Sequence, residues 1–596
     1  MRLHKTPYGL YDHLVRLKVL TLLLMVNVGN VVHSAVLPCT EYVIVGAGAA
    51  GIQMGVYLQH HGLPYIIFEK GQDAGTFWLS YPVTNELISV NSPPSKQNKS
   101  VDPRYEWHGL LNTSVAFKTF STRFFPLRSE YHEYLNSVVA VEALHVEWGV
   151  EVVQLLPGPC VRLASGQRVC ARRIFVATGL EEIPRPKLDE KGIISYSNFH
   201  RSMVDGEKVC IFGNGNSAWE LAQASFQTAE AVSVIGRRPT RWSMVTKYTG
   251  DVRIKYAQTM ENFHSKLKAF ASPLVYNGEP IGDEFARDIT VGVATHSYPE
   301  SSIRNLCTVS FHAWGFRSRL LGGSYGGLFP ADLDTNKTWY ESRAHDRVHY
   351  IGWHMHKHDF RQGAGGFASG FRYLIRNLWQ HVQAIDQPRT ALNEMEVTVS
   401  EIAPYVAQRI QSADDIVIMQ DGNVLRDVIE LIRVGDHCEL ESSRWRYLSG
   451  WNYNFLTPRR KLSAATIYFA WGTQSRDAST IWNEQFHVQS RSFFGSSLRN
   501  ILLHPVIEWR GFQVHLMEQP LNDWEDIIGA VQSVFDELLP LIVSTHCGRL
   551  LRPRLRLSPR WIRPTMGTRG TSPRMDDVEV SEEQYLKSME WLRQFR

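Results

Sequence analysis

The sequence predicts an α/β fold organised around two glycine-rich turns, each between a strand and a helix. The first turn, GAGAAG at 46–51, follows the apolar run 42–45. The second, GNGNS at 213–217, follows the apolar run 209–212. Each turn leads into a helix-like stretch and then into a further apolar run, which is the order of elements in a βαβ unit. Two such units on one chain predict two separate α/β domains.

The first turn has the composition of a dinucleotide-binding loop. Glycines permit a tight turn and let the backbone approach a pyrophosphate, whose charge then lies at the N-terminus of the following helix. The next apolar run ends in Glu69. A carboxylate roughly 20 residues after the loop commonly binds a ribose hydroxyl. We therefore expect a dinucleotide on Gly46, Gly48, Gly51 and Glu69; the alternative is a glycine-rich turn without a ligand.

The second turn differs at the end of its second strand. A helix is expected from about residue 218 to about 227, and a strand over 231–235. No acidic residue follows that strand; Arg237 and Arg241 do. Because a guanidinium can bind a 2′-phosphate with two parallel hydrogen bonds, this loop favours NADP(H) over NAD(H). A solvated basic turn is the alternative.

Two further segments predict how the domains are connected. Residues 173–179 form a strand that ends in Ala-Thr-Gly, between the two glycine turns. After the second unit, 348–352 is another strand followed by a glycine, and a glycine-rich segment follows at 364–373. This order predicts that the first domain is split and that the second is inserted into it.

These motifs together resemble the flavin-containing monooxygenase superfamily. The resemblance runs from about residue 40 to about residue 545, and its longest run is HDFRQGAGGFASGFRY at 358–373. Within the superfamily, the chain resembles a branch of endoplasmic-reticulum flavoproteins linked to the degradation of misfolded proteins. The other matching segments are GAGAAGIQM (46–54), LISVN (87–91), VATGL (176–180), GNGNSAWE (213–220), TKYTGDVR (246–253) and LHPVIEW (503–509).

The resemblance implies FAD on the first loop and NADPH on the second. It also places Asn91 beside the flavin ring as a catalytic residue; the alternative is that Asn91 only opens the turn at 92–94, as asparagine often does. The loop 364–370 would place backbone donors near the flavin carbonyl groups. The FAD site would comprise Gly46, Gly48, Gly51, Glu69, Gly179, Asp359, Gly365, Gly366 and Phe367, and the NADPH site Gly213, Gly215, Ser217, Arg237 and Arg241.

The implied architecture is an α/β flavoprotein with two dinucleotide-binding domains and a C-terminal α+β region. In that region, 394–399 and 415–419 are expected as strands and 524–543 as a helix capped by Asn522 or Asp523. The expected divisions are a signal peptide (1–34), a split FAD-binding Rossmann-like domain (37–200 and 341–385), an inserted NADPH-binding Rossmann-like domain (201–340), the C-terminal region (386–545) and a mobile basic tail with a short terminal helix (546–596).

The chain departs from its relatives in two places. The monooxygenase pattern FxGxxxH corresponds here to residues 194–200, of which only His200 is kept, so oxygen insertion into a substrate is disfavoured. The chain ends in 593–596, RQFR, rather than in a retrieval signal of the Lys-Asp-Glu-Leu type. Entry into the endoplasmic reticulum is therefore better supported than retention there.

The N-terminus predicts that entry. Basic residues precede the short apolar run 19–26, and small residues suit cleavage before Ala35. The run is too short to favour a membrane-spanning helix, although an uncleaved anchor is the alternative; no anchor is expected after cleavage. Sequons at Asn98, Asn112 and Asn336 agree with a secretory route.

Composition and cysteine spacing narrow the function classes. The chain has 44% hydrophobic residues and a net charge of +4, so nothing indicates a nucleic-acid partner. Its seven cysteines include no Cys-x-x-Cys pair, which disfavours a flavin-linked dithiol reductase. A disulfide such as Cys160–Cys170 is possible, and the odd count leaves at least one cysteine unpaired.

His354, His356 and His358 would share one face of a strand, but without further ligands no metal site is expected; the resemblance places this segment beside the flavin.

The expected function is an NADPH-reduced, FAD-dependent oxidoreductase of the endoplasmic-reticulum lumen that acts in protein quality control. Its expected partners are non-native protein clients and degradation factors. One alternative is a client-binding factor whose flavin is structural, and another is a substrate-oxygenating flavin monooxygenase. The eight arginines between 549 and 574 indicate a solvated tail or, alternatively, a surface for an acidic partner or a membrane.

Overall fold

The protein is described here from a computed structural model. The described residues are 40–89, 91, 107–184, 186–189, 192–213, 215–236, 255–256, 274–275, 307–318, 335, 340–358, 364–386, 394–419, 424–452, 456, 460–461, 463–471, 503–510, 512–516, 524–547 and 562–565. The expected signal peptide, the sequons at Asn98 and Asn336, the caps Asn522 and Asp523 and most of the basic tail lie outside these residues.

The first sheet confirms the split α/β arrangement. Its five strands are parallel and lie in the order β15-β7-β1-β2-β3. In sequence, β15 is the last of these five strands, and the other four all precede the second glycine turn. The bounds are β1 (Tyr42–Val45), β2 (Tyr65–Glu69), β3 (Val146–Trp148), β7 (Arg173–Val176) and β15 (Val348–Tyr350).

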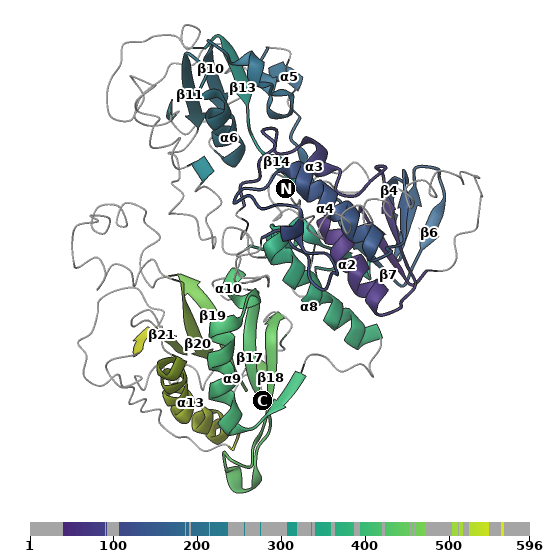
Figure 1. Ribbon diagram of the computed structural model, residues 1–596. Helices are drawn as coiled ribbons and strands as arrows, with labels where there is room; N and C mark the ends of the chain where they lie inside the picture. The colour runs from purple at the N-terminus through teal and green to yellow at the C-terminus, as the bar shows by residue number, and fades with distance from the viewer. Residues whose placement is uncertain are drawn as a thin grey trace, which may run out of the picture. The chain divides into compact units, whose positions relative to one another are not determined.

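Helices cover this sheet, whose central strands are apolar except for Glu69 at the end of β2 and Arg173 at the start of β7. Every residue of β1 and β2 is buried, as expected for parallel strands with helices on both faces. The helix α2 (Ala49–His60) follows the first glycine turn and packs against α8 (Ala368–Asp386) (Figure 1). The helix α4 (Arg128–Val141) contributes Tyr131, Tyr134 and Leu135 to the same core.

The second sheet is also parallel, in the order β12-β11-β10-β13-β9. Its helix α6 (Asn216–Ser225) begins and ends two residues earlier than the sequence indicated. The edge strand β9 comes from before residue 201, so this sheet draws on residues ahead of the expected domain start. The bounds are β9 (Ile194–Ser195), β10 (Lys208–Phe212), β11 (Ala231–Gly236), β12 (Leu274–Val275) and β13 (Val309–His312).

The C-terminal region forms an antiparallel sheet in the order β16-β18-β17-β19-β20-β21-β22, whose edge strand β22 comes from the segment expected as the basic tail. The helices α9 (Val399–Ser412) and α13 (Trp524–His546) pack together and share a hydrophobic core with the central strands (Figure 1). The bounds are β16 (Glu394–Val397), β17 (Leu425–Arg433), β18 (Arg444–Asn452), β19 (Ala464–Trp471), β20 (Leu503–Trp509), β21 (Phe512–Leu516) and β22 (Ile562–Thr565).

The expected strand at 415–419 is wrong. These residues form a single helical turn, α10 (Asp415–Ile418), because two aspartates satisfy the backbone donors at its start. The Asp414 side chain accepts a hydrogen bond from the Asp415 N–H, and the Asp415 side chain accepts one from the Ile416 N–H. A short apolar run alone does not distinguish a buried strand from a buried helical turn.

Shorter elements connect these sheets. A three-stranded antiparallel sheet consists of β4 (Val152–Leu156), β5 (Cys160–Leu163) and β6 (Arg168–Cys170), and β8 (Leu180–Glu182) pairs with β14 (Phe316–Ser318). The short helices are α3 (Phe77–Ser80), α5 (Pro186–Asp189), η1 (Phe117–Thr119), η2 (Tyr196–Asn198), η3 (Arg201–Met203), η7 (Gly352–Lys357) and η9 (Asp436–Cys438).

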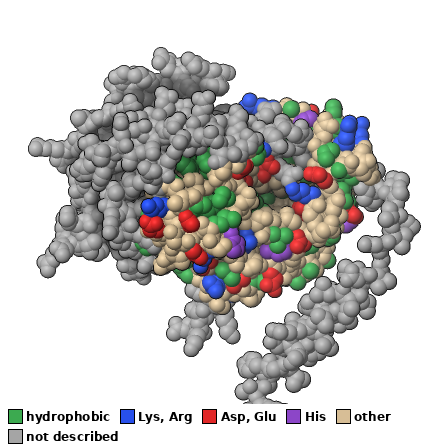
Figure 2. All heavy atoms as spheres, turned by 90° about the horizontal axis from the view of Figure 1, so that it is seen from above, with side chains coloured by type: hydrophobic (Ala, Val, Ile, Leu, Met, Phe, Trp, Pro, Cys, Tyr) green, Lys and Arg blue, Asp and Glu red, His purple; other side chains and the backbone are tan. Residues whose placement is uncertain are grey.

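Six cysteines form three disulfides: Cys160–Cys170, Cys210–Cys307 and Cys438–Cys547. Within the described part of the chain, none of the helices combines the length and the apolar character needed to cross a membrane. On the face shown in Figure 2, positive and negative side chains are interspersed over the described surface.

Candidate functional site

The first glycine turn leaves room for a ligand at one position and none at the other two. Gly46 has φ +103°, and a Cβ there would lie 2.7 Å from the carbonyl oxygen of Ala177. A Cβ on Gly51 would lie 1.9 Å from the Gly46 carbonyl oxygen, so only glycine allows the helix to start this close to the strand. A Cβ on Gly48 would meet nothing within 4 Å. Gly48 is also the N-cap of α2 and provides no side-chain cap for its backbone donors. An anion can therefore approach the helix N-terminus at this point.

Glu69 is placed beside this turn, as the sequence indicated. It ends β2 and is buried. Its Oε2 accepts a hydrogen bond from the Ala47 N–H at 2.7 Å, and its Oε1 accepts one from the Gly71 N–H at 2.8 Å. Each carboxylate oxygen has a further lone pair, so the group can also accept hydrogen bonds from sugar hydroxyls.

The second turn repeats the geometry of the first. Gly213 has φ +136°, and a Cβ there would lie 2.3 Å from the Ala313 carbonyl oxygen. Gly215 is the uncapped N-cap of α6, and a Cβ on it would again meet nothing within 4 Å. Ser217 lies in the first turn of α6, and Ala218 takes the place that Gly51 holds in the first turn, since it follows Gly213 at the same spacing.

Backbone hydrogen bonds fix both turns in the same way. In the first, the Gly46 N–H donates to the Phe68 carbonyl at 2.8 Å; in the second, the Gly213 N–H donates to the Ile235 carbonyl at 2.8 Å. Phe68 and Ile235 are therefore equivalent positions, and so are the residues that follow them, Glu69 and Gly236. The second site thus has a glycine where the first has its carboxylate. The second site therefore lacks the acidic group that would repel a 2′-phosphate. Arg237 and Arg241, which were expected to bind that phosphate, lie outside the described residues.

Asn91 is fully buried with one hydrogen-bonding atom unused. Its Nδ2 donates to the carbonyl oxygens of Ser121 at 3.2 Å and Arg123 at 3.3 Å, and its N–H donates to the Phe124 carbonyl at 2.8 Å. These two carbonyl groups fix the orientation of the amide, because a flipped amide would set oxygen against oxygen. The Oδ1 is then a buried acceptor without a partner among the residues that the structure describes. Such an atom costs about 1–3 kcal/mol unless a ligand donates to it.

The segment after β15 contacts the first glycine turn. Gly352 has φ +74°, and a Cβ there would lie 2.6 Å from the Cβ of Ala50. The next residues form the 3-10 helix η7 rather than a strand, because this left-handed glycine ends β15; the expectation that the histidines share one strand face was wrong. His354 Nε2 lies 3.2 Å from Thr178 Oγ1, next to Gly179, which has φ +67°. Among the described residues, no group of three metal-ligating side chains is suitably placed for an ion.

Burial keeps His354 neutral. It lowers the pKa of the imidazole to about 4. The Nδ1 of His354 is buried and has no partner within the described ranges of the chain. Thr178 and His354 therefore link the Ala-Thr-Gly segment to η7. The sequence singled out both segments, but it gave no signal that they meet.

Gly365, Gly366 and Phe367 precede α8, close to η7. A Cβ on Gly366 would lie 2.8 Å from the Trp353 ring and 3.0 Å from His356 Cδ2. A Cβ on Gly370 would lie 2.0 Å from the Ala364 carbonyl oxygen, so the loop is closed by backbone contact. Asp359 lies outside the described residues.

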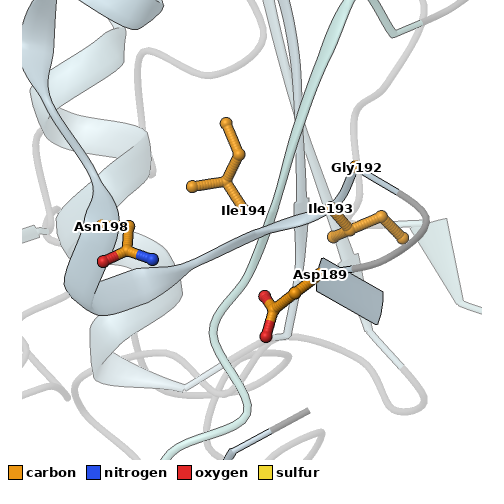
Figure 3. A pocket seen from close by; sticks show the side chains of 5 residues that line it. All are labelled: Asp189, Gly192, Ile193, Ile194 and Asn198. Atoms are coloured by element: carbon orange, nitrogen blue, oxygen red, sulfur yellow. The ribbon is translucent and has the colours of Figure 1, made fainter. Parts of the chain in front are cut away.

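The structure thus assembles most of the expected first site from separate parts of the chain. The first turn, Glu69 and the Ala-Thr-Gly segment meet directly, and η7 connects the turn to the 364–370 loop. The second turn belongs to another sheet. A cavity of about 200 Å³ in that second domain is lined by none of the expected cofactor residues (Figure 3). Its lining residues are Asp189, Gly192, Ile193, Ile194 and Asn198.

Comparison with known proteins agrees with this geometry. Residues 43–275 match the family described as pyridine nucleotide-disulphide oxidoreductase. The chain is 26% identical over 465 residues to the FAD-dependent oxidoreductase domain-containing protein 2 of Danio rerio, covering 67% of this chain and 66% of the relative. It is 28% identical over 447 residues to the Mus musculus protein of the same name, covering 66% and 65%. The match thus spans slightly less than two thirds of these relatives.

Among solved structures, a mutant of the flavin monooxygenase of Stenotrophomonas maltophilia is 18% identical, with a TM-score of 0.43. The match covers 58% of this chain and 99% of that chain. The chain is related to flavin-dependent oxidoreductases and has the fold of a flavoprotein with two dinucleotide-binding domains, one of them split around the other.

Proposed function

We propose that the protein is an FAD-dependent oxidoreductase that is reduced by NADPH in the lumen of the endoplasmic reticulum. FAD binds the turn at 46–51 with Glu69, and NADPH binds the turn at 213–217. When both are bound, these cofactors supply hydride transfer from nicotinamide to flavin. The chain contributes binding, orientation and a site shielded from water.

The observation that carries this proposal is the equivalence of the two glycine turns. Each has a first glycine that only glycine can occupy, and each has a second glycine that leaves open space at an uncapped helix N-terminus. Two helix N-termini on one chain that are each open to a pyrophosphate fit an enzyme that binds two dinucleotides. The carboxylate at the first site suits a ribose, and Gly236 in its place at the second suits a phosphorylated ribose.

Asn91 is proposed to complete the flavin site. Its free Oδ1 accepts a hydrogen bond from the bound cofactors, which removes the cost of burying an unpaired acceptor. The alternative, in which Asn91 only starts a turn, gives no reason for a fully buried amide held by two carbonyl groups.

Three disulfides support an oxidising compartment, since cytosolic thiols are kept reduced. The sequon at Asn112 lies in an exposed turn, where a glycan is sterically accessible. By resemblance to its relatives, the protein is proposed to act in quality control on non-native proteins together with degradation factors. Recovery of the chain in the cytosol with free cysteines would contradict this location.

Matched substitutions at the two open glycines test the assignment. Gly48→Val fills the open space at the first turn and Gly215→Val that at the second, and apart from the chain neighbours no described atom lies within 4 Å of either Cβ position. We expect Gly48→Val to purify without flavin absorbance. We expect Gly215→Val to keep the flavin but to bind NADPH at least about tenfold more weakly. Flavin occupancy is measured by absorbance, and NADPH affinity by the rate of flavin reduction.

Gly529→Ala is the control, because Gly529 also has open space around its Cβ position but lies in α13. It should leave both cofactors unaffected. A Gly48→Val protein that remains yellow would overturn the flavin assignment, and unchanged NADPH binding in Gly215→Val would overturn the nicotinamide assignment.

A further inference from the structure

The sheet β4-β5-β6 carries a disulfide that plays no part in binding the two cofactors. Cys160 begins β5 and Cys170 ends β6, and the two residues lie directly opposite one another in the antiparallel register. Cys160 is buried, with 5% of its surface exposed, whereas Cys170 is exposed. A thiol in solution can therefore reach one sulfur, Cys170 Sγ, and the other is shielded.

One guanidinium contacts both sulfurs. Arg168 Nε donates to Cys170 Sγ at 3.3 Å, and Arg168 Nη2 donates to Cys160 Sγ at 3.3 Å. A disulfide sulfur is a weak, neutral acceptor. A guanidinium interacts much more strongly with a thiolate, which carries a full negative charge. The position of Arg168 is thus suited to the state in which the bond between the sulfurs has been broken.

A second arginine adds positive charge on the same face. Arg162 lies directly opposite Arg168 across the β5–β6 pair, and both are exposed. Directly opposed like charges destabilise a strand pair. Neither arginine forms a salt bridge in the part of the chain that the structure describes. A thiolate formed between these strands would offset their repulsion.

We propose that Cys160–Cys170 is a thiol–disulfide exchange site that accepts electrons from a protein dithiol. The thiolate of the dithiol attacks Cys170 Sγ, the Cys160–Cys170 bond breaks, and Cys160 leaves as a thiolate beside Arg168. The second thiol of the dithiol then loses its proton and attacks the mixed disulfide, which releases Cys170. The dithiol is oxidised to a disulfide, and the cysteine pair is reduced by the same two electrons and takes up the two protons.

The other two disulfides serve as internal comparators. Cys210 is completely buried in β10. Its partner Cys307 is only partly exposed, whereas Cys170 is exposed. Cys438 and Cys547 are both partly exposed, so a thiol can reach this pair as well, but among the described residues no arginine donates to their sulfurs. Comparison with Cys210–Cys307 therefore measures the effect of access to the more exposed sulfur, and comparison with Cys438–Cys547 separates access from the guanidinium.

The experiment treats the folded full-length protein with dithiothreitol and stops the reaction at intervals by alkylation. Mass spectrometry then gives the reduction rate of each pair. Cys160–Cys170 should be reduced at least about tenfold faster than Cys210–Cys307 and also faster than Cys438–Cys547. If Cys438–Cys547 is reduced as fast as Cys160–Cys170, the proposal is wrong.

Substitution of the arginine tests its role. Arg168→Gln removes the charge beside the leaving thiolate and should slow reduction of Cys160–Cys170 by about threefold. Arg168→Lys should slow it less, and Arg201→Gln, at an exposed arginine in η3, should not slow it. The rate at Cys438–Cys547 reports whether each variant is folded. An unchanged rate in Arg168→Gln would also overturn the proposal. The assay needs no flavin, so its outcome is independent of the proposed cofactor chemistry.

Discussion

The buried imidazole of His354, near the first dinucleotide site, makes the stability of the fold depend on pH. His354 lies beside Thr178, and burial lowers the pKa of its ring to about 4, from 6.5. Between these values the unfolded chain binds a proton at this position and the folded chain does not. Stability is therefore lost as the pH falls from about 6.5 towards about 4.

This difference predicts the pH dependence of unfolding. His354 alone should make the folded protein about 2 kcal/mol less stable at pH 5 than at pH 7. In His354→Asn, the difference between urea midpoints at the two pH values should shrink accordingly. His200→Asn, at an exposed histidine, is the control and should keep the full difference. A His354→Asn protein with an unchanged pH difference would show that this imidazole is not held neutral by the fold.

The sequence predicted contacts between residues correctly where both partners belong to the same sequence motif. The Glu69 carboxylate and the glycine turn are close in sequence, and periodicity and composition were sufficient to pair them. The contact between Gly352 and Ala50 joins positions far apart in the chain. The only sequence feature that pointed to it was the glycine at the end of the expected strand. The carbonyl groups that hold Asn91 come from a loop without any motif, so the sequence could not reveal them.

At the scale of elements, the C-terminal sheet depends on a buried charge network. Asp427 on β17 is completely buried. It accepts two hydrogen bonds from Arg409 on α9, at 2.7 and 2.9 Å, and one from the Tyr447 hydroxyl at 2.6 Å. Arg409 also donates to Asp415 on α10, at 2.7 Å. This network ties both helices to the central strand.

Removing the central carboxylate should destabilise this region strongly. Asp427→Asn leaves Arg409 with one carboxylate instead of two, and breaking a buried pair of this kind costs about 3–5 kcal/mol. The urea midpoint should fall accordingly. Glu396→Gln is the matched control, because Glu396 pairs with Arg444 at an exposed position, where the effect should be negligible. Equal midpoints for the two variants would mean that the network does not hold the sheet.

The same network explains why sequence reasoning failed for α10. The apolar residues 416–418 suit a strand, and the tertiary contacts of Asp415 with Arg409 and Arg376 add to its local hydrogen bonds in favouring the helical turn. By contrast, the apolar pattern of α13 extends over many turns, and the expected helix was confirmed. Long periodic elements can be predicted from sequence, whereas single turns depend on contacts made elsewhere.

At the scale of the whole molecule, the split domain was predictable and the C-terminal topology was not. The order of glycine turns and apolar runs indicated that 348–352 returns to the first sheet, and β15 does so. The order β16-β18-β17 in the C-terminal sheet depends on which strands pair, and no local pattern specifies that choice.

The central claim is that one chain binds both dinucleotides and passes electrons between them. The most direct measurement is the absorbance of the purified flavin-containing protein, without oxygen, as NADPH is added. The flavin band should bleach. Gly215→Val should require a higher NADPH concentration for the same bleaching. A bound flavin that stays oxidised at saturating NADPH would contradict the account and would favour a protein that holds its flavin as a structural group.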